Sequence, residues 1–327
     1  MNTQGLSIEE CQAIYFDNAV LLKQPRKLFR LHGYSAGRYY YDDNGNDINY
    51  YISVTNLIAS TMPTPEPLKK WIADMGYEES KRYMNERADY GTFMHMKFQE
   101  LLINQSLNLD MIDEDLRLYI QSCQLSPTLF ESWLPEMKKD ILGFAQFIID
   151  YKVKPLAIEV VLASKFGFAG AVDLICHMTI PKKDFFGEVY KSGENKGQPK
   201  ETTLYFEIFA IIDFKSGRKN FYESHEIQLE AYKWMIGENF PHLEMSALRL
   251  FNYSPSEWRT VPGYKLKDQT DSPNRKKLQH LINIAAIETS KREKSVLQIS
   301  GILFLDKPVT DCFKEITIEE LIISNRV

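Results

Sequence analysis

The sequence contains only four cysteines, and they lie far apart. Cys11, Cys123, Cys176 and Cys312 form no C-x-x-C pair, so neither a zinc ribbon nor an iron–sulfur cluster finds its usual spacing. Scattered cysteines of this kind are typical of reduced thiols, which predicts a cytoplasmic protein.

Long apolar runs are absent as well. None approaches the roughly 18 residues that span a membrane, and the longest, such as Phe206–Phe214, are strand-sized and carry a charge. Met1–Cys11 has no basic stretch followed by an apolar one, which predicts no secretory signal. We therefore expect no membrane partner.

Neither charge sign is in large excess, since the formal net charge is −5 over 327 residues. This balance excludes a uniformly basic surface but permits a local basic groove, and the acidic ligands of a metal site count toward the total. The chain is 44% hydrophobic and 25% charged, with 16 Gly and 14 Pro, which excludes disordered, collagen-like and low-complexity chains.

The N-terminal half shows a hairpin followed by helices. Arg38–Tyr41 and Ile48–Val54 are rich in aromatic and β-branched residues and flank Asn44-Gly45, a strong turn signal. Thr55 is a predicted N-cap for a short helix that ends before a proline-rich stretch. That short helix is predicted over Asn56–Ser60, and further helices are predicted to begin near Leu68 and near Gly91 and to cover Glu136–Tyr151.

The C-terminal half changes to strand-like patterns. Strands are predicted over Ala157–Ser164, Phe168–His177, Tyr205–Lys215 and Ala247–Tyr253, with helices over His225–Ile236 and Asn274–Arg292 and short strand-like pieces at Leu297–Leu305 and Glu315–Ile323. The alternation predicts an α/β fold in which helices flank a central sheet. We expect residues 1–155 to form the hairpin and helical region and residues 156–327 the core of one integrated domain.

A polar segment, Thr179–Thr203, interrupts two predicted strands. It holds five lysines and three glycines. The lysines are Lys182, Lys183, Lys191, Lys196 and Lys200. One interpretation is a solvated mobile loop; the other is a flexible basic arm that contacts the phosphates of a nucleic acid.

Acidic residues within apolar strands are the main chemical signal. Asp213 and Lys215 are two apart on a strand, so both point to one face, where an acid can hold a divalent metal and a lysine can orient water. Asp173 lies between apolar neighbours, which is costly unless the carboxylate is paired or binds a metal. Glu159, on the preceding strand, is a third acid that can reach the same site directly or through water. The alternatives are a surface ion pair and an edge-strand acid.

Two predicted helices supply further polar groups. His95 follows Gly91-Thr92 on what we predict to be the first turn of a helix. A lone helical histidine is more often packed than a ligand, but with two acids and a lysine it fits an oxygen-rich Mg²⁺ or Mn²⁺ site. Gln228 and Tyr232 lie four residues apart on one helix face and can hold Lys215 or a phosphate, unless that face is simply solvated.

Together these pieces resemble the PD-(D/E)XK nuclease superfamily, and more narrowly its RecB-like, phage-type exonuclease branch. The pattern there is G-T-x-x-H on a helix, G-x-x-D on a strand, (D/E)-x-K on the next strand and Q-x-x-x-Y on a helix. Here the ordered set comprises Gly91-Thr92 with His95, Gly170 with Asp173, Asp213 with Lys215 and Gln228 with Tyr232. The upstream Ile52–Ile58 is similar to an S-V-T segment of these enzymes, and the spacing from Asp173 to Asp213 is longer than usual.

The resemblance implies a restriction-endonuclease-like core and hydrolysis of DNA phosphodiesters, most simply by an exonuclease in recombination, repair or phage DNA processing. It implies one or two Mg²⁺ or Mn²⁺ ions held by His95, Asp173, Asp213 and the main-chain carbonyl of Phe214, with Lys215 positioning or deprotonating water. The expected compartment is the cytoplasm of a bacterial or phage-infected cell, and a recombination or replication protein is a potential partner.

Three alternatives remain at this stage. One is a nucleic-acid-binding protein that keeps the fold without the chemistry, another is a structure-specific endonuclease on the same fold, and the third is an unrelated α/β protein with accidental motifs. The chain has no G-x-x-x-x-G-K-[ST] pattern, so we expect no nucleotide as cofactor, and it lacks the iron–sulfur cysteines of some related nucleases, so we expect no iron–sulfur cluster.

Overall fold

The structure is a computed structural model that describes residues 22, 25–31, 38–43, 48–189, 191–194, 196, 198–217, 221–243 and 245–293. The predicted Asn44-Gly45 turn and the pieces predicted after residue 296 lie outside these residues. The chain divides into two units, Met1–Ala285 and Ala286–Val327, and the second is described only as far as residue 293.

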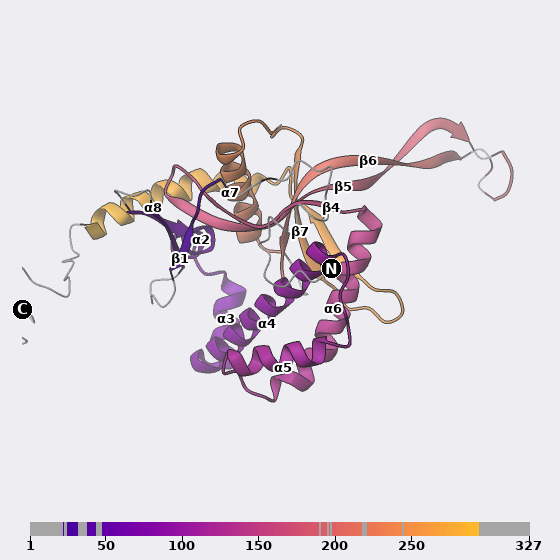
Figure 1. Cartoon of the computed structure of the whole chain (residues 1–327). Coiled ribbons are helices and arrows are strands. Elements are labelled where there is room, and N and C mark those ends of the chain that lie inside the picture. Colours follow the sequence, from indigo (N-terminus) through magenta and orange to yellow (C-terminus); the bar gives the residue numbers. More distant parts are fainter. Residues whose placement is uncertain are drawn as a thin grey trace, which may run out of the picture. The chain divides into compact units, whose positions relative to one another are not determined.

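A mixed sheet forms the centre of the first unit (Figure 1). Its eight strands are joined in the order β1-β2-β3-β5-β6-β7-β8, with β4 also paired to β5. The pairs β3–β5 and β6–β7 are parallel, and the remaining pairs are antiparallel. The strands are β1 Phe29–Leu31, β2 Tyr39–Asp43, β3 Ile48–Ser53, β4 Lys154–Ala163, β5 Phe168–Val189, β6 Pro199–Phe214, β7 Leu248–Pro255 and β8 Tyr264–Asp268.

Helices pack on both faces of this sheet, which confirms the expected α/β architecture (Figure 1). The helices are α2 Val54–Thr61, α3 Glu66–Met75, α4 Tyr77–Asn104, α5 Ile112–Ser122, α6 Leu129–Tyr151, α7 Glu223–Asn239, a 3₁₀ turn Pro273–Lys276 and α8 Lys277–Glu293. One hydrophobic core joins α2, α7 and the start of α8 to the sheet, and the other joins α4, α5 and α6 to its opposite face.

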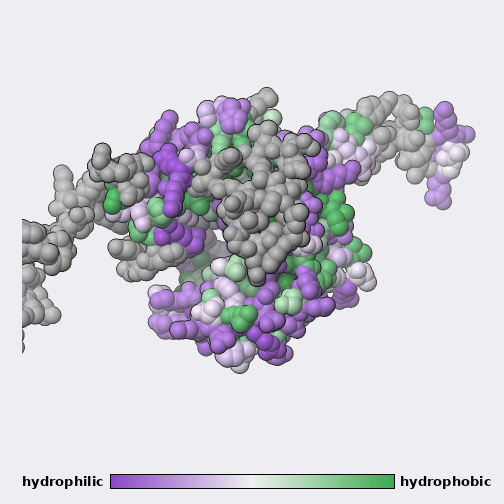
Figure 2. Space-filling model, in the orientation of Figure 1, coloured by the Kyte–Doolittle hydropathy of each residue, from purple (hydrophilic) through white to green (hydrophobic). Residues whose placement is uncertain are grey.

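Strand alternation explains how one sheet serves two cores. Ile211 belongs to the core under α7, whereas its neighbour Ile212 belongs to the core under α4 and α6. Leu250 and Phe251 divide in the same way. On the outer surface of α3, α4 and α5, hydrophilic residues predominate and hydrophobic ones are scattered among them (Figure 2). Such helices bury one face and solvate the other.

Several helix boundaries differ from those predicted, and α6 begins at Leu129 rather than at Glu136. Ser53, not Thr55, caps α2, and its hydroxyl accepts a hydrogen bond from the Asn56 N–H at 3.1 Å. Gly91 does not begin a helix but lies inside α4, which has 28 residues. A side chain at Gly91 would place its Cβ 3.0 Å from Oγ of Ser216, so the glycine permits a close approach between α4 and the end of β6.

The segment predicted to interrupt two strands instead continues them. β5 and β6 stay paired from Leu174 opposite Ile212 to Val189 opposite Pro199. Pairing of β4 with β5 ends at His177, and β7 pairs with β6 only from Phe209 onward. Among the described residues, the outer parts of β5 and β6 therefore pair only with each other and form a two-stranded ribbon (Figure 1).

A gap along one edge of β5 opens the sheet. β6 leaves this edge at Leu174, while β3 pairs with β5 only at Phe168 and Ala169. β4 pairs with Ala169 as well, so β4 occupies the other edge and β3 shares the edge used by β6. The residues between, Gly170–Asp173, have no described strand beside them on that edge, and a cavity lies there.

Candidate metal centre

Two carboxylates from neighbouring strands form the floor of the cavity. Ile158 pairs with Leu174 and Val160 with Val172, so Glu159 lies opposite Asp173 across β4 and β5. Glu159 has a φ of 51°, the left-handed region, in the middle of its strand. Such a conformation costs about 1–3 kcal/mol and is concentrated at functional sites.

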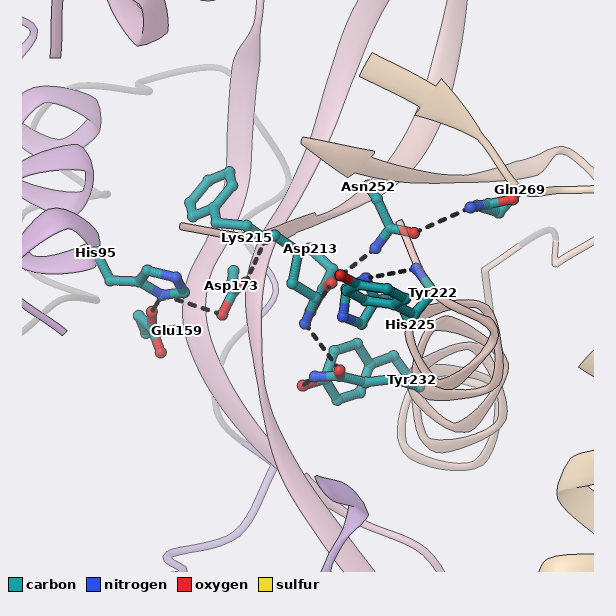
Figure 3. A network of polar contacts seen from close by, with 12 residues as sticks. His95, Glu159, Asp173, Asp213, Lys215, Tyr222, His225, Tyr232, Asn252 and Gln269 are labelled. Carbon is teal, nitrogen blue, oxygen red and sulfur yellow. Dashed lines mark hydrogen bonds and ion pairs between the residues drawn. The ribbon is translucent and has the colours of Figure 1, made fainter. Parts of the chain in front are cut away.

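Helix α4 brings His95 to these two acids. The imidazole Nδ1 lies 3.5 Å from Oε1 of Glu159 and 3.6 Å from Oδ1 of Asp173 (Figure 3). Potential ligand atoms of the three residues all lie within 4.8 Å of one another. We call His95, Glu159 and Asp173 the ligand cluster. His95 thus stands beside Asp173, as the sequence predicts, although it sits deep within α4 rather than on a first turn.

Burial and charge act against each other in the ligand cluster. Burial disfavours a charged imidazole, but the carboxylates of Asp173 and Glu159 outweigh it and raise the pKa of His95 to about 9. Burial raises the pKa of Asp173 to about 7, and repulsion from Glu159 adds to the rise. Without a cation, the cluster therefore holds a proton that a bound metal would displace.

Asp213 and Lys215 form a second group beside the ligand cluster. Their side chains share one face of β6, and the Lys215 ammonium donates to Oδ1 of Asp213 at 3.0 Å. Asp213 is 1% exposed, and burial raises its pKa while Lys215 opposes the rise. The backbone N–H of Phe214 donates to Oδ2 of Asp173 at 2.6 Å, so this peptide group joins the two groups.

Residues of helix α7 also hold the Lys215 side chain. Oε1 of Gln228 accepts from the Lys215 ammonium at 2.9 Å, and Nε2 of Gln228 donates to the Tyr232 hydroxyl at 2.6 Å. Burial raises the pKa of Tyr232 well above its usual range, so the phenol stays neutral. A Cβ on Gly170 would lie 3.1 Å from the Tyr232 ring, so this glycine makes room for the tyrosine.

The cavity has a volume of about 590 Å³ and is lined by every predicted site residue. Two exposed arginines, Arg30 and Arg38, add positive charge to its wall. Burial and the neighbouring Arg38 lower the pKa of Arg30. Sequence reasoning missed both arginines, because β1 and the start of β2 carry no motif.

Three further residues near the site were not predicted. Asn252 on β7 contacts Asp213, and Gln269, the residue after β8, contacts Asn252 (Figure 3). His225, at the start of α7, has a pKa lowered to about 3 by burial and by Lys215, and its Nδ1 accepts from the Tyr222 N–H at 3.3 Å. Its position three residues before Gln228 was the only sequence signal for it.

The donor set suits a hard divalent cation. Two ligand atoms that share one Mg²⁺ at about 2.1 Å in octahedral geometry lie about 3 Å apart. The distances from His95 to Glu159 and Asp173 are slightly longer than this and can contract around an ion. Carboxylates with one imidazole favour Mg²⁺ or Mn²⁺ over structural zinc.

No protein-family model matches the chain, and no curated protein matches it in sequence. Among the described residues, no helix is both long enough and apolar enough to cross a membrane.

Proposed function

We propose that the chain is a metal-dependent DNA nuclease, most simply an exonuclease, built on a restriction-endonuclease-like core of the PD-(D/E)XK superfamily. The observation that supports it best is the joint position of the ligand cluster and Lys215 in one open cavity. A carboxylate–imidazole site next to a partly buried lysine can bind a cation, a water molecule and a phosphate together.

His95, Glu159 and Asp173 would hold the metal, with Asp213 and the Phe214 carbonyl as the further ligands that the sequence predicts. A bound Mg²⁺ or Mn²⁺ would polarise the phosphoryl oxygens and lower the pKa of water. The three ligand residues come from α4, β4 and β5, so a rigid scaffold sets their positions.

Lys215 would orient the attacking water and stabilise charge on the phosphate. Gln228 and Asp213 hold its ammonium group, and the side chain remains only 19% exposed. Arg30 and Arg38, which line the same cavity, would neutralise backbone phosphates of the substrate. All groups required for hydrolysis are present, which favours an enzyme over a catalytically silent binding protein.

The test is digestion of end-labelled single- and double-stranded DNA with Mg²⁺, with Mn²⁺ and with a chelator. We expect metal-dependent cleavage, lost in Asp213→Ala and reduced on the order of 10²–10⁴-fold in Lys215→Ala, the usual range for a positioned proton-transfer group. Lys165→Ala, an exposed lysine on a turn, is the matched control.

Direct Mn²⁺ titration separates the two roles. Asp213→Ala should bind the ion weakly, whereas Lys215→Ala should bind it at least as well as the wild type because a competing positive charge is gone. If folded wild-type protein cleaves neither DNA nor RNA with either ion, the enzyme proposal is wrong and a binding role gains support.

A further inference from the structure

Behind Asp213 lie two buried amides, of which Asn252 contacts the carboxylate and Gln269 contacts Asn252. Nδ2 of Asn252 donates to Oδ2 of Asp213 at 2.7 Å, and Nε2 of Gln269 donates to Oδ1 of Asn252 at 3.3 Å (Figure 3). Asn252 is 0% exposed and Gln269 is 3% exposed. Burying an amide destabilises the fold unless the amide is hydrogen-bonded. Two linked buried amides next to one carboxylate therefore indicate a role for the hydrogen bonds between them.

The direction of each hydrogen bond in this pair is fixed by chemistry. An ionised carboxylate only accepts, so the Asn252 amide must present its NH₂ group to Asp213. Its carbonyl then faces away and requires a donor, which the NH₂ group of Gln269 supplies. Gln269 thereby selects the orientation in which Asn252 donates.

The backbone fixes these positions as firmly as the side chains do. Asn252 is the register partner of Asp213 in the parallel pair β6–β7. The backbone N–H of Gln269 donates to the Leu250 carbonyl at 2.8 Å, which anchors the residue that follows β8. Asn252 therefore approaches Asp213 from a paired strand, Gln269 is anchored by its backbone hydrogen bond, and neither residue lines the cavity.

We propose that Asn252 and Gln269 are positioning residues that orient the Asp213 carboxylate for the metal. The inference rests on the proposed metal-dependent function. Asn252 and Lys215 both contact Oδ2 of Asp213, so the carboxylate cannot rotate freely, and Oδ1, which Lys215 also contacts, keeps a lone pair for the cation. Outer-shell groups of this kind change metal affinity by about 10–100-fold when they are removed.

The experiment is a calorimetric Mn²⁺ titration of the full chain in wild-type, Asn252→Leu, Gln269→Leu and Gln269→Glu forms. We expect Asn252→Leu to weaken Mn²⁺ binding about 10–100-fold. Gln269→Glu should weaken it more than Gln269→Leu, because an ionised Glu faces the Asn252 carbonyl with an acceptor and opposes the donating orientation.

Asn239→Leu is the matched control for a simple loss of stability. Asn239 on α7 donates to the Ala163 and Met235 carbonyls at 2.8 Å each and does not contact Asp213. Its variant should lower the melting temperature and leave Mn²⁺ affinity unchanged. Wild-type affinity in Asn252→Leu, or an equal loss in Asn239→Leu, would overturn the positioning role, whereas a wild type that binds no Mn²⁺ would overturn the metal site itself.

Discussion

Glu159 faces Asp173 across β4 and β5, and it does so from a left-handed backbone conformation. Two carboxylates directly opposite each other repel, and a positive φ at a residue with a side chain adds strain. The sheet therefore tolerates two unfavourable features at one position. A divalent cation between the carboxylates would remove the repulsion, whereas the backbone strain would remain.

The first prediction is that Glu159→Gly stabilises the fold while it weakens metal binding. Glycine adopts positive φ without strain, and the change also removes the repulsion with Asp173. The change should relieve about 1–3 kcal/mol of backbone strain and cost about 0.5–1 kcal/mol for placing a glycine in a strand. The net gain in the free energy of unfolding is then about 1 kcal/mol. Above pH 9, where the His95 imidazole is neutral and the variant loses no ion pair with it, the melting temperature of metal-free protein should rise by about 2 °C.

Glu207→Gly is the control for this prediction. Glu207 is an exposed glutamate on β6 that does not have a positive φ. Its glycine variant should lose about 0.5–1 kcal/mol and bind Mn²⁺ normally. If Glu159→Gly is as destabilising as Glu207→Gly, the backbone of Glu159 is not strained.

The second prediction concerns pH. Because His95 has a pKa of about 9, it carries a proton at neutral pH, and a metal must displace that proton. Apparent Mn²⁺ affinity should therefore rise with pH between 6 and 8, by about tenfold per pH unit for one displaced proton. The rise should be steeper below pH 7, where Asp173 is protonated as well. Calorimetry in two buffers of different ionisation enthalpy counts the protons released.

A histidine pair supplies the comparison. His95→Asn should bind Mn²⁺ more weakly. Its Mn²⁺ affinity should also depend less steeply on pH, because one fewer proton is displaced. His225→Asn should keep the wild-type slope, because the His225 pKa of about 3 leaves that imidazole neutral over this range. An unchanged slope in His95→Asn would show that the imidazole is not a metal ligand.

The third prediction is that Gly170→Ala disturbs the hydrogen bonds that join Lys215, Gln228 and Tyr232, although no charged residue is replaced. The added Cβ would lie 3.1 Å from Cε1 of Tyr232 and 3.3 Å from Cγ2 of Val54. Tyr232 is buried and bonded to Gln228, so it cannot move freely. We expect a loss of about 1–3 kcal/mol in stability and a lower cleavage rate, with Mn²⁺ affinity nearly unchanged. Gly217→Ala should be close to neutral in thermal melts and cleavage assays, because no described heavy atom lies within 4 Å of a Cβ there.

The sequence predicted those parts of the site that depend on short spacings. Side chains two apart on a strand share a face, which places Asp213 beside Lys215. Side chains four apart on a helix also share a face, which places Gln228 beside Tyr232. The structure brings the two pairs together through Lys215 and Gln228, as the sequence allowed.

Long-range packing accounts for what the sequence did not predict. The sequence around Gly91 resembles a helix start. The structure instead shows that a glycine is needed there because Ser216, just after β6, packs closely against it. Asn252 acquires its role only through its register with Asp213, and Gln269 only through Asn252. The positive φ of Glu159 has no local signal, because glutamate does not favour that conformation.

The last prediction concerns the ribbon formed by the outer parts of β5 and β6. Lys182, Lys191 and Lys196 are exposed on it or on its connecting turn. Its five lysines lie among four acids, so the segment 179–203 has a net excess of only one positive charge. A ribbon that binds DNA must therefore use individual lysine–phosphate contacts rather than a broad positive field. The acids are Asp184, Glu188, Glu194 and Glu201.

Replacement of all five lysines with Gln should flatten the salt dependence of DNA binding by roughly 0.7–0.9 per lost phosphate contact, on a plot of log K against log salt. The apparent Michaelis constant should rise and the rate at saturating DNA should change little, because the ligand cluster is untouched. Replacement of the four acids with their amides should strengthen DNA binding by removing repulsion. Binding isotherms across a salt series measure both variants. If neither variant changes affinity or slope, the ribbon does not contact the nucleic acid, and its strands extend beyond the sheet for another reason.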